Sequence, residues 1–376
     1  MSALPIARLF DFEIRVHVTW AVILAVIAVT VVSQVETTAP ASSPQLRWVL
    51  GGVVAMLFLA SAVAHELGHA IAARRAGAPG GVVVVYFFGG AASPILETRT
   101  PRDEIVAAAA GPVVSIVIGL CLLAVAVAGT AIGGEGWAIV GQVALVVGIL
   151  NLVLGGVNLL PAFPLDGGRI ARAVGWARTG DPAKGLRFAA RSGRGLGIAA
   201  AAAGIVLILT RDSIDGLMLV LSGWFLVSSS RAVERMAAVD GLLEGLVVRD
   251  VLDRDAKGVP AGLTLDTFAA QVLDVPGGSV AIVDGPKLLG VLGERQVRRV
   301  RRSRWQDTRA GDLMTAADDL PAIDPETTLR AALDHLHRTG LDGLPVLESG
   351  VLAGLVTRRA VAEVIRGRVA AKGGPA

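Results

Sequence analysis

Two histidines and a glutamate stand in the pattern His65-Glu66-Leu67-Gly68-His69. Residues four apart share one face of a helix, so His65 and His69 can hold one metal ion together. Glu66 points in the next direction around the helix, where it can act as a base toward a water that the metal activates. The spacing therefore predicts the site of a zinc hydrolase.

The surroundings of this pattern strengthen the prediction. It lies in an apolar stretch from about Trp48 to Ala73. An ionisable group at bilayer depth costs roughly 2.5–3.5 kcal/mol on insertion scales, so three of them within five residues indicate use. The alternative is a chance match on an ordinary helix face, which is the usual case in soluble proteins.

The composition indicates an integral membrane protein with a soluble part. Of 376 residues, 53% are hydrophobic and only 18% are charged, fewer charges than a soluble chain of this size carries. The net charge is +3, and most of the excess Arg and Lys residues flank apolar segments. This distribution is typical of a membrane protein and argues against a nucleic-acid partner. Cys121, the single cysteine, has no partner for a disulfide and is expected to be a small core residue.

Six apolar segments approach or reach the length needed to cross a bilayer. They are Val18–Ser33, Trp48–Ala73, Ile105–Ala128, Trp137–Leu160, Leu196–Leu209 and Ile214–Ser229. Basic residues precede the first segment and follow the second and fourth, so the amino terminus and the soluble remainder are predicted to be cytoplasmic. We expect a multi-pass protein of the cell (inner or plasma) membrane, with cleavage of the first segment as a signal peptide left open.

A run of β-branched and aromatic residues at 82–88, ending in Gly89-Gly90, is too short to span as a helix. It favours a strand or hairpin that enters the protein interior, with a connecting loop as the alternative.

The composition becomes that of a soluble domain after Arg231. We expect a membrane domain at 1–230, a helical linker at 231–247 and a soluble domain at 248–370. Val248-Arg249-Asp250-Val251-Leu252 recurs weakly as Ala310-Gly311-Asp312-Leu313-Met314, which predicts two repeats at about 248–305 and 310–370.

A catalytic zinc keeps three protein ligands, so a third must come from elsewhere in the membrane region. The fourth span ends in the sequence NLLPAFPLDGGR, residues 158–169, whose prolines loosen the helix near Asp166. Spans two and four run in the same direction, so Asp166 can share the depth of the histidines. From spacing alone, Asp166 is equally well explained as a metal ligand or as a residue of an ordinary Leu-Asp-Gly-Gly turn.

HELGH on one membrane helix and NLLPAFPLDGGR at the end of another together resemble the site-2 protease family of intramembrane zinc metalloproteases. The resemblance implies that His65, His69 and Asp166 ligate one Zn²⁺ and that Glu66 is the general base. It also implies that Asn158 binds substrate or stabilises the transition state, and that the hairpin ending at Gly89 and Gly90 binds substrate. The implied fold is a membrane α-helical bundle of about six transmembrane helices with a short membrane-associated β-hairpin.

The soluble tail resembles a tandem pair of CBS domains, an α+β module. Such pairs often bind adenine nucleotides through a Gly-h-h-Thr/Ser-x-x-Asp signature. Residues 354–360 keep the hydroxyl as Thr357 but place Ala360 at the Asp position, and residues 290–296 lack both groups. The sequence thus leaves nucleotide binding open, with Thr357 as its candidate residue.

We predict a zinc endopeptidase that cleaves a transmembrane segment of a single-pass protein near the cytoplasmic side. By resemblance, the substrate is a membrane-tethered regulator such as an anti-sigma factor, and the CBS pair is a regulatory module through which the chain could form a homodimer. The main alternative is a CBS-regulated ion transporter or channel, in which the metal site would serve permeation. An inactive scaffold is a third hypothesis, which a complete set of metal ligands disfavours.

Overall fold

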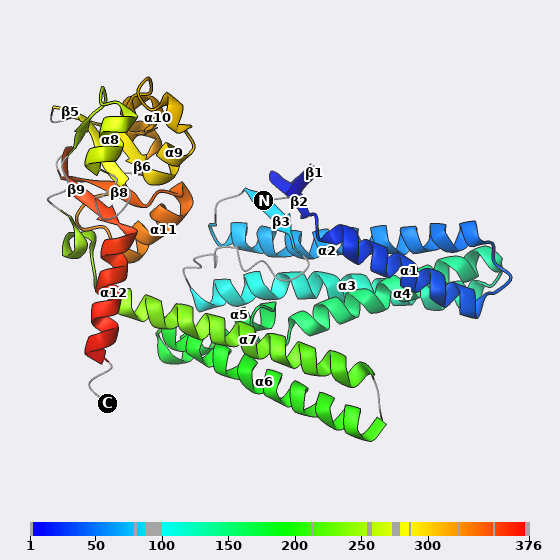
Figure 1. Cartoon of the computed structure of the whole chain (residues 1–376). Coiled ribbons are helices and arrows are strands. Elements are labelled where there is room, and N and C mark those ends of the chain that lie inside the picture. The colour runs from blue at the N-terminus through cyan, green and yellow to red at the C-terminus, as the bar shows by residue number, and fades with distance from the viewer. Residues whose placement is uncertain are drawn as a thin grey trace. The chain divides into compact units, whose positions relative to one another are not determined.

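The chain forms two compact units, Met1–Ala237 and Ala238–Ala376 (Figure 1). The computed structural model describes residues 3–78, 81–86, 100–211, 214–253, 258–272, 279–285, 287–321, 323–348 and 350–372.

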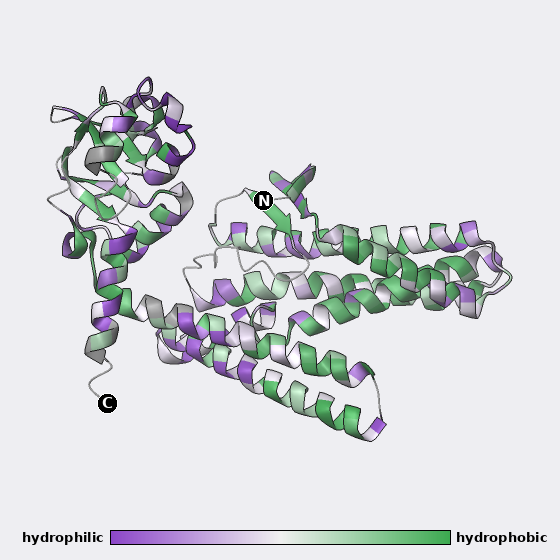
Figure 2. Cartoon of the chain, in the orientation of Figure 1, coloured by the Kyte–Doolittle hydropathy of each residue, from purple (hydrophilic) through white to green (hydrophobic). Residues whose placement is uncertain are grey.

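Six helices of the first unit are long and apolar enough to cross a membrane, among the residues that the structure describes. They are α1 (Trp20–Thr38), α2 (Pro44–Arg75), α3 (Pro101–Ile132), α4 (Glu135–Asn158), α6 (Pro182–Arg211) and α7 (Ile214–Leu243). Figure 2 shows that hydrophobic residues dominate along α1 to α4, whereas hydrophilic residues are frequent toward the start of α6 and the end of α7. The predicted bundle of six membrane helices is confirmed, and with it the predicted fold class.

Cap residues explain where the longer helices begin. The Ser43 hydroxyl accepts from the backbone N–H of Leu46, and the Thr100 hydroxyl accepts from that of Asp103, each ahead of a proline at the first helical position. The fifth helix, α6, is much longer than the apolar run 196–209. The helix begins after Asp181, whose carboxylate accepts from two backbone N–H groups at 2.7 and 3.2 Å. Basic residues lower the hydropathy of its first half, so the span predicted from the sequence does not include that half.

Helices α6 and α7 approach each other closely through glycines. A Cβ added at Gly223 would lie 2.5 Å from the carbonyl oxygen of Gly197, and one added at Gly204 would lie 2.6 Å from that of Gly216. No side chain fits at these points, so backbone packs on backbone, the mode that small residues allow between membrane helices.

Two strands before α1 and one strand after α2 form a three-stranded sheet of order β1-β2-β3. β1 (Ala3–Leu9) and β2 (Phe12–His17) form an antiparallel hairpin, and β3 (Val82–Val85) pairs in parallel with β2. Arg74, at the end of α2, donates to the carbonyl oxygen of Phe10 in the hairpin turn at 2.9 Å. The strand expected at 82–88 is present over 82–85, whereas the hairpin 3–17 was not expected. Residues 87–99 lie outside the described part of the chain.

The second unit repeats one βαββα pattern. β5 (Ser279–Asp284) pairs antiparallel with β6 (Lys287–Gly293), and β8 (Gly343–Glu348) pairs in the same way with β9 (Val351–Thr357). Both pairs carry a register shift at the equivalent point, so 279–293 in the first copy matches 343–357 in the second. This register gives the weak sequence repeat a structural basis.

The remaining elements of the second unit complete the two copies. They are η1 (Val248–Val251), β4 (Val259–Pro260), α8 (Leu265–Val272), α9 (Glu294–Arg298), η2 (Arg302–Arg304), α10 (Ala310–Leu313), β7 (Thr315–Ala316), η3 (Ala317–Asp319), α11 (Leu329–Thr339) and α12 (Arg358–Lys372). β7 pairs with β6, while Asp253 bridges to Leu355 on β9. Each copy therefore contributes a segment to the other, which ties the two into one module.

Candidate metal centre

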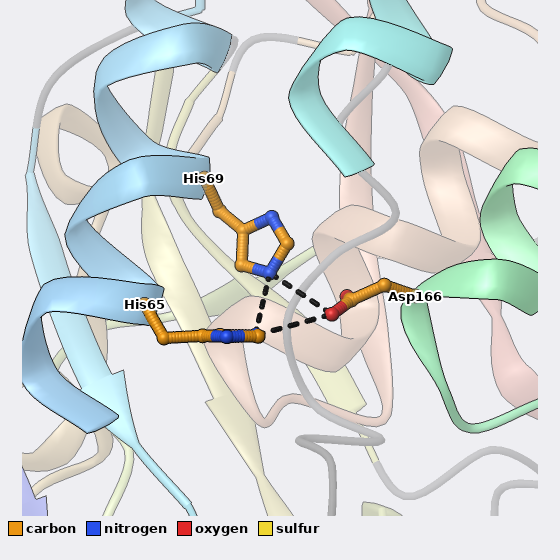
Figure 3. A group of neighbouring side chains, drawn as sticks. All are labelled: His65, His69 and Asp166. Carbon is orange, nitrogen blue, oxygen red and sulfur yellow. Dashed lines mark hydrogen bonds and ion pairs between the residues drawn. The ribbon is translucent and has the colours of Figure 1, made fainter. Parts of the chain in front are cut away.

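Three side chains from two helices meet at one point of the membrane unit (Figure 3). Nε2 of His65 and Nε2 of His69, both on α2, lie 3.2 Å apart. The Oδ2 atom of Asp166, the first residue of α5 (Asp166–Thr179), lies 3.2 Å from the former and 3.1 Å from the latter. The structure thus brings together the three residues that the sequence offered as zinc ligands.

The triangle of donor atoms has the size of a zinc site. Two ligands at about 2.0–2.1 Å from a tetrahedral zinc lie about 3.3 Å from each other, close to the separations seen here. The donor set of two imidazoles and one carboxylate leaves a fourth position open, as in catalytic rather than structural sites. The residues present therefore fit Zn²⁺.

Each histidine ring is hydrogen-bonded through Nδ1, which leaves Nε2 directed at the meeting point of the three side chains. Nδ1 of His69 lies 2.7 Å from the carbonyl oxygen of Ala107, which only accepts, so Nδ1 carries a proton and Nε2 is the atom available to a metal. Nδ1 of His65 lies 2.9 Å from the buried hydroxyl of Ser115. Both partners belong to α3, which therefore orients both rings.

The third member of the cluster is held as an anion. Burial favours the neutral form of Asp166, but the imidazoles of His65 and His69, whose Nε2 atoms lie 3.2 and 3.1 Å from its Oδ2 atom, outweigh burial and hold the pKa of the Asp166 carboxyl below its usual range. An ionised carboxylate is the form that binds a cation.

The structure describes two of the other site residues predicted in the membrane unit and leaves two outside its described part. Glu66 is part-buried on α2, and its carboxylate interacts electrostatically with both histidines and with Asp166. Asn158 ends α4, and its amide donates to the carbonyl oxygen of Leu154 at 2.9 Å; no hydrogen bond among the described residues joins it to the cluster. Gly89 and Gly90 lie outside the residues that the structure describes.

A glycine on α3 makes room for one imidazole. A Cβ added at Gly111 would lie 2.3 Å from Nε2 of His69. Approaches below 3.0 Å are essentially never seen for real Cβ atoms, so any side chain at 111 would displace the ring. The sequence held only a faint signal for this role, the Ala110-Gly111-Pro112 element within an apolar run.

A buried ion pair fastens α5, and with it Asp166, to α3. Arg172 donates from Nε and Nη2 to the two carboxylate oxygens of Glu104, each at 2.7 Å. The Glu104 side chain is completely buried and that of Arg172 is 12% exposed. Sequence reasoning missed Glu104, Arg172 and Ser115, because nothing local in the sequence separates them from other polar residues near apolar runs.

The second unit contains a pocket of about 290 Å³ lined by both copies. Its lining residues are Gly293, Gln296, Arg299, Thr315, Thr339, Gly340, Leu341 and Asp342. Thr357 is not among them: it is 5% exposed, and its hydroxyl accepts from the backbone N–H of Ala360 at the start of α12. Its predicted nucleotide contact is therefore not visible in this conformation.

We expect Gly111→Ala to weaken zinc binding about 10- to 100-fold, the range seen when groups that orient a metal ligand are disturbed. The added methyl group overlaps the His69 ring. Zinc content after purification and competition with a chelator measure the effect. Gly156→Ala on α4 is the matched control, because a Cβ there meets nothing within 4 Å. Equal zinc affinity in both variants would contradict the steric argument.

We expect Glu104→Gln to lower the stability of the membrane unit by about 3–5 kcal/mol, since it leaves the Arg172 guanidinium buried without its counter-ion. Unfolding in detergent, followed by circular dichroism, measures the change. Glu234→Gln serves as the control, because the Glu234–Arg194 pair has side chains 30% and 41% exposed and should contribute only about 0–1 kcal/mol. A similar loss in the two variants would show that burial of the first pair has no special weight.

Two family profiles match this chain. The profile of Peptidase family M50 matches residues 136–200, which include Asp166, and that of the CBS domain matches residues 310–367.

Relatives of similar length are named zinc metalloproteases. Rip3 of Mycobacterium tuberculosis is 32% identical over 97% of this chain and 93% of its own length. The protein sll0528 of Synechocystis is 30% identical over 96% of this chain and 95% of its own length. The solved site-2 protease of Methanocaldococcus jannaschii aligns with 62% of this chain and 95% of that chain, with 24% identity and a TM-score of 0.38. On the strength of the sequence relatives, this multi-pass membrane protein belongs to the site-2 protease family of zinc metalloproteases, peptidase family M50, in the branch with a C-terminal CBS module.

Proposed function

We propose that this metalloprotease is an intramembrane endopeptidase, which cleaves the transmembrane segment of a single-pass protein near the cytoplasmic side. The observation that carries the proposal is the meeting of His65, His69 and Asp166 on helices of the membrane unit, at zinc-ligand separations. A site built between membrane helices suits a peptide bond that is itself in the membrane.

In this mechanism His65, His69 and Asp166 hold the metal, and Glu66 moves the proton. Zn²⁺ held by these residues would act as a Lewis acid and would lower the pKa of a bound water. The carboxylate of Glu66 accepts a proton from that water and later delivers it to the amine of the leaving peptide. Ser115 and the Ala107 carbonyl keep both imidazoles aimed at the metal throughout.

The substrate must lose helical structure before it is cut, because the carbonyls of an intact transmembrane helix are already hydrogen-bonded. β3 lies at the edge of its sheet and can pair with an extended substrate strand. We assign Gly89 and Gly90 to the same substrate-binding segment, and Asn158 to contact with the substrate near the scissile bond.

We assign the CBS module to the cytoplasm and to regulation of cleavage. Basic residues follow the second and fourth spans, which supports a cytoplasmic position for the carboxyl-terminal unit. Membrane-tethered regulators such as anti-sigma factors are the substrate class that we favour, and a homodimer formed through the CBS module is the assembly that we favour. The pocket between the two CBS copies is where an adenine nucleotide would bind, with Arg299 available to a phosphate group.

Purified protein in liposomes, given a labelled single-pass peptide with a Gly-Pro pair near its cytoplasmic end, should cleave it. Glu66→Gln should slow cleavage about 10²- to 10⁴-fold, the usual contribution of a general acid–base group, and a zinc chelator should abolish it. Glu135→Gln, at the exposed start of α4, is the control and should cleave normally. Cleavage that survives both Glu66→Gln and the chelator would exclude this mechanism.

AMP or ATP should raise the unfolding temperature of the second unit in the full-length protein, because a ligand that binds only the folded state stabilises it. Arg299→Gln should remove most of this shift, whereas Arg301→Gln, an exposed neighbour outside the pocket lining, should retain it. Differential scanning calorimetry measures the shift, and its absence in the parent would exclude the nucleotide.

A further inference from the structure

Arg169 has buried hydrogen-bond donors with nothing to bind. It stands on α5 one turn after Asp166, and its Nε and Nη2 atoms are buried without a partner among the residues that the structure describes. A guanidinium presents five N–H donors, and burial without partners costs free energy, so such groups mark places where a partner is expected.

Other arginines in the chain show the ordinary structural alternative. Arg172, three residues further along α5, uses two nitrogens on the Glu104 carboxylate. Arg358 in the second unit donates to the backbone carbonyls of Leu341 and Leu336. Arg169 makes neither kind of bond with any residue that the structure describes, which separates it from arginines that only fasten elements together.

The position of Arg169 directs it to the metal centre. Residues three apart on a helix are neighbours on one face, so Arg169 lies beside Asp166. Its positive charge also acts on the carboxylate of Glu66, which comes from α2. Arg169 thus shares a helix face with the proposed zinc ligand and acts electrostatically on the proposed base.

We propose that Arg169 is a further catalytic residue, which donates hydrogen bonds to the carbonyl oxygen of the scissile peptide bond as that oxygen becomes negatively charged. The inference rests on the proposed function and deepens it. Donors fixed in advance where charge develops are usually the largest single contribution to this type of catalysis. A guanidinium suits this task because it keeps its charge and a rigid planar fork.

The movement of charge during the reaction gives Arg169 a partner at each stage. Before attack, the negative charge is on Glu66. As the water oxygen bonds to the carbonyl carbon, Glu66 takes the water proton and becomes neutral, while the electron pair of the C=O double bond moves onto the carbonyl oxygen. The charge therefore passes from one oxygen near Arg169 to another. When the C–N bond breaks, the C=O bond re-forms and the amine nitrogen takes the proton from Glu66.

Two peptide inhibitors with the same flanking residues test this role without turnover. A phosphinate mimics the tetrahedral state, with one oxygen for zinc and a second for a hydrogen-bond donor, whereas a thiol needs only zinc. In zinc-loaded protein, Arg169→Gln should weaken phosphinate binding about 100- to 1,000-fold, as for loss of an oxyanion donor. Thiol affinity and zinc content should match the parent. Arg178→Gln, on an exposed position of α5, should bind both inhibitors normally.

Activity on the labelled single-pass peptide provides the second measurement. Arg169→Gln should lower kcat with little change in KM, and guanidinium ion should restore part of the activity of Arg169→Ala. Normal phosphinate binding in Arg169→Gln would overturn the proposal, and so would equal loss of phosphinate, thiol and zinc, which indicates a structural role. Failure of the parent itself to bind either inhibitor would instead overturn the proposed function.

Discussion

The membrane unit is organised around one requirement: the three atoms that could bind a metal ion must be held within about 3 Å of one another inside a bundle of apolar helices. Two of them come from one face of α2, where a spacing of four residues places His65 above His69. The third comes from Asp166, which is distant in sequence and stands at the start of a short helix. Any loss of position in α5 therefore separates the carboxylate from the imidazoles.

α3 supplies the contacts that meet this requirement. Along one helix it offers a carbonyl oxygen to His69, a hydroxyl to His65, space for the His69 ring at Gly111 and a carboxylate for Arg172. The first three act on α2 and the last acts on α5. Since α3 contacts both α2 and α5, it positions the two histidines and Asp166 relative to one another.

The sequence singled out His65, His69 and Asp166 because each belongs to a local motif, and the structure brings the three together. It predicted six membrane helices because a long apolar run is visible from neighbouring residues alone. It could not predict the partners on α3. Ser115 and Glu104 differ in no local way from other polar residues near apolar runs, and their roles arise only when α3 packs against α2 and α5. The hairpin 3–17 was missed although Phe12–His17 alternates apolar and polar residues, which is the local signal of a half-buried strand.

The two CBS copies share one backbone register but make different hydrogen bonds where their second long strand meets the following helix. Gly293 and Thr357 occupy matching positions at the ends of β6 and β9. In the second copy the Thr357 hydroxyl accepts from the N–H of Ala360, so it caps α12. In the first copy Gly293 has no hydroxyl, and the side chain of Gln296 reaches back to accept from the N–H of Gly293 at 2.7 Å. These bonds are opposite halves of a capping box: Thr357 accepts from an N–H three residues later, whereas Gly293 donates its own N–H to a side chain three residues later, and Gly293 also lines the pocket. The two copies are therefore chemically unequal at the ends of their matching strands.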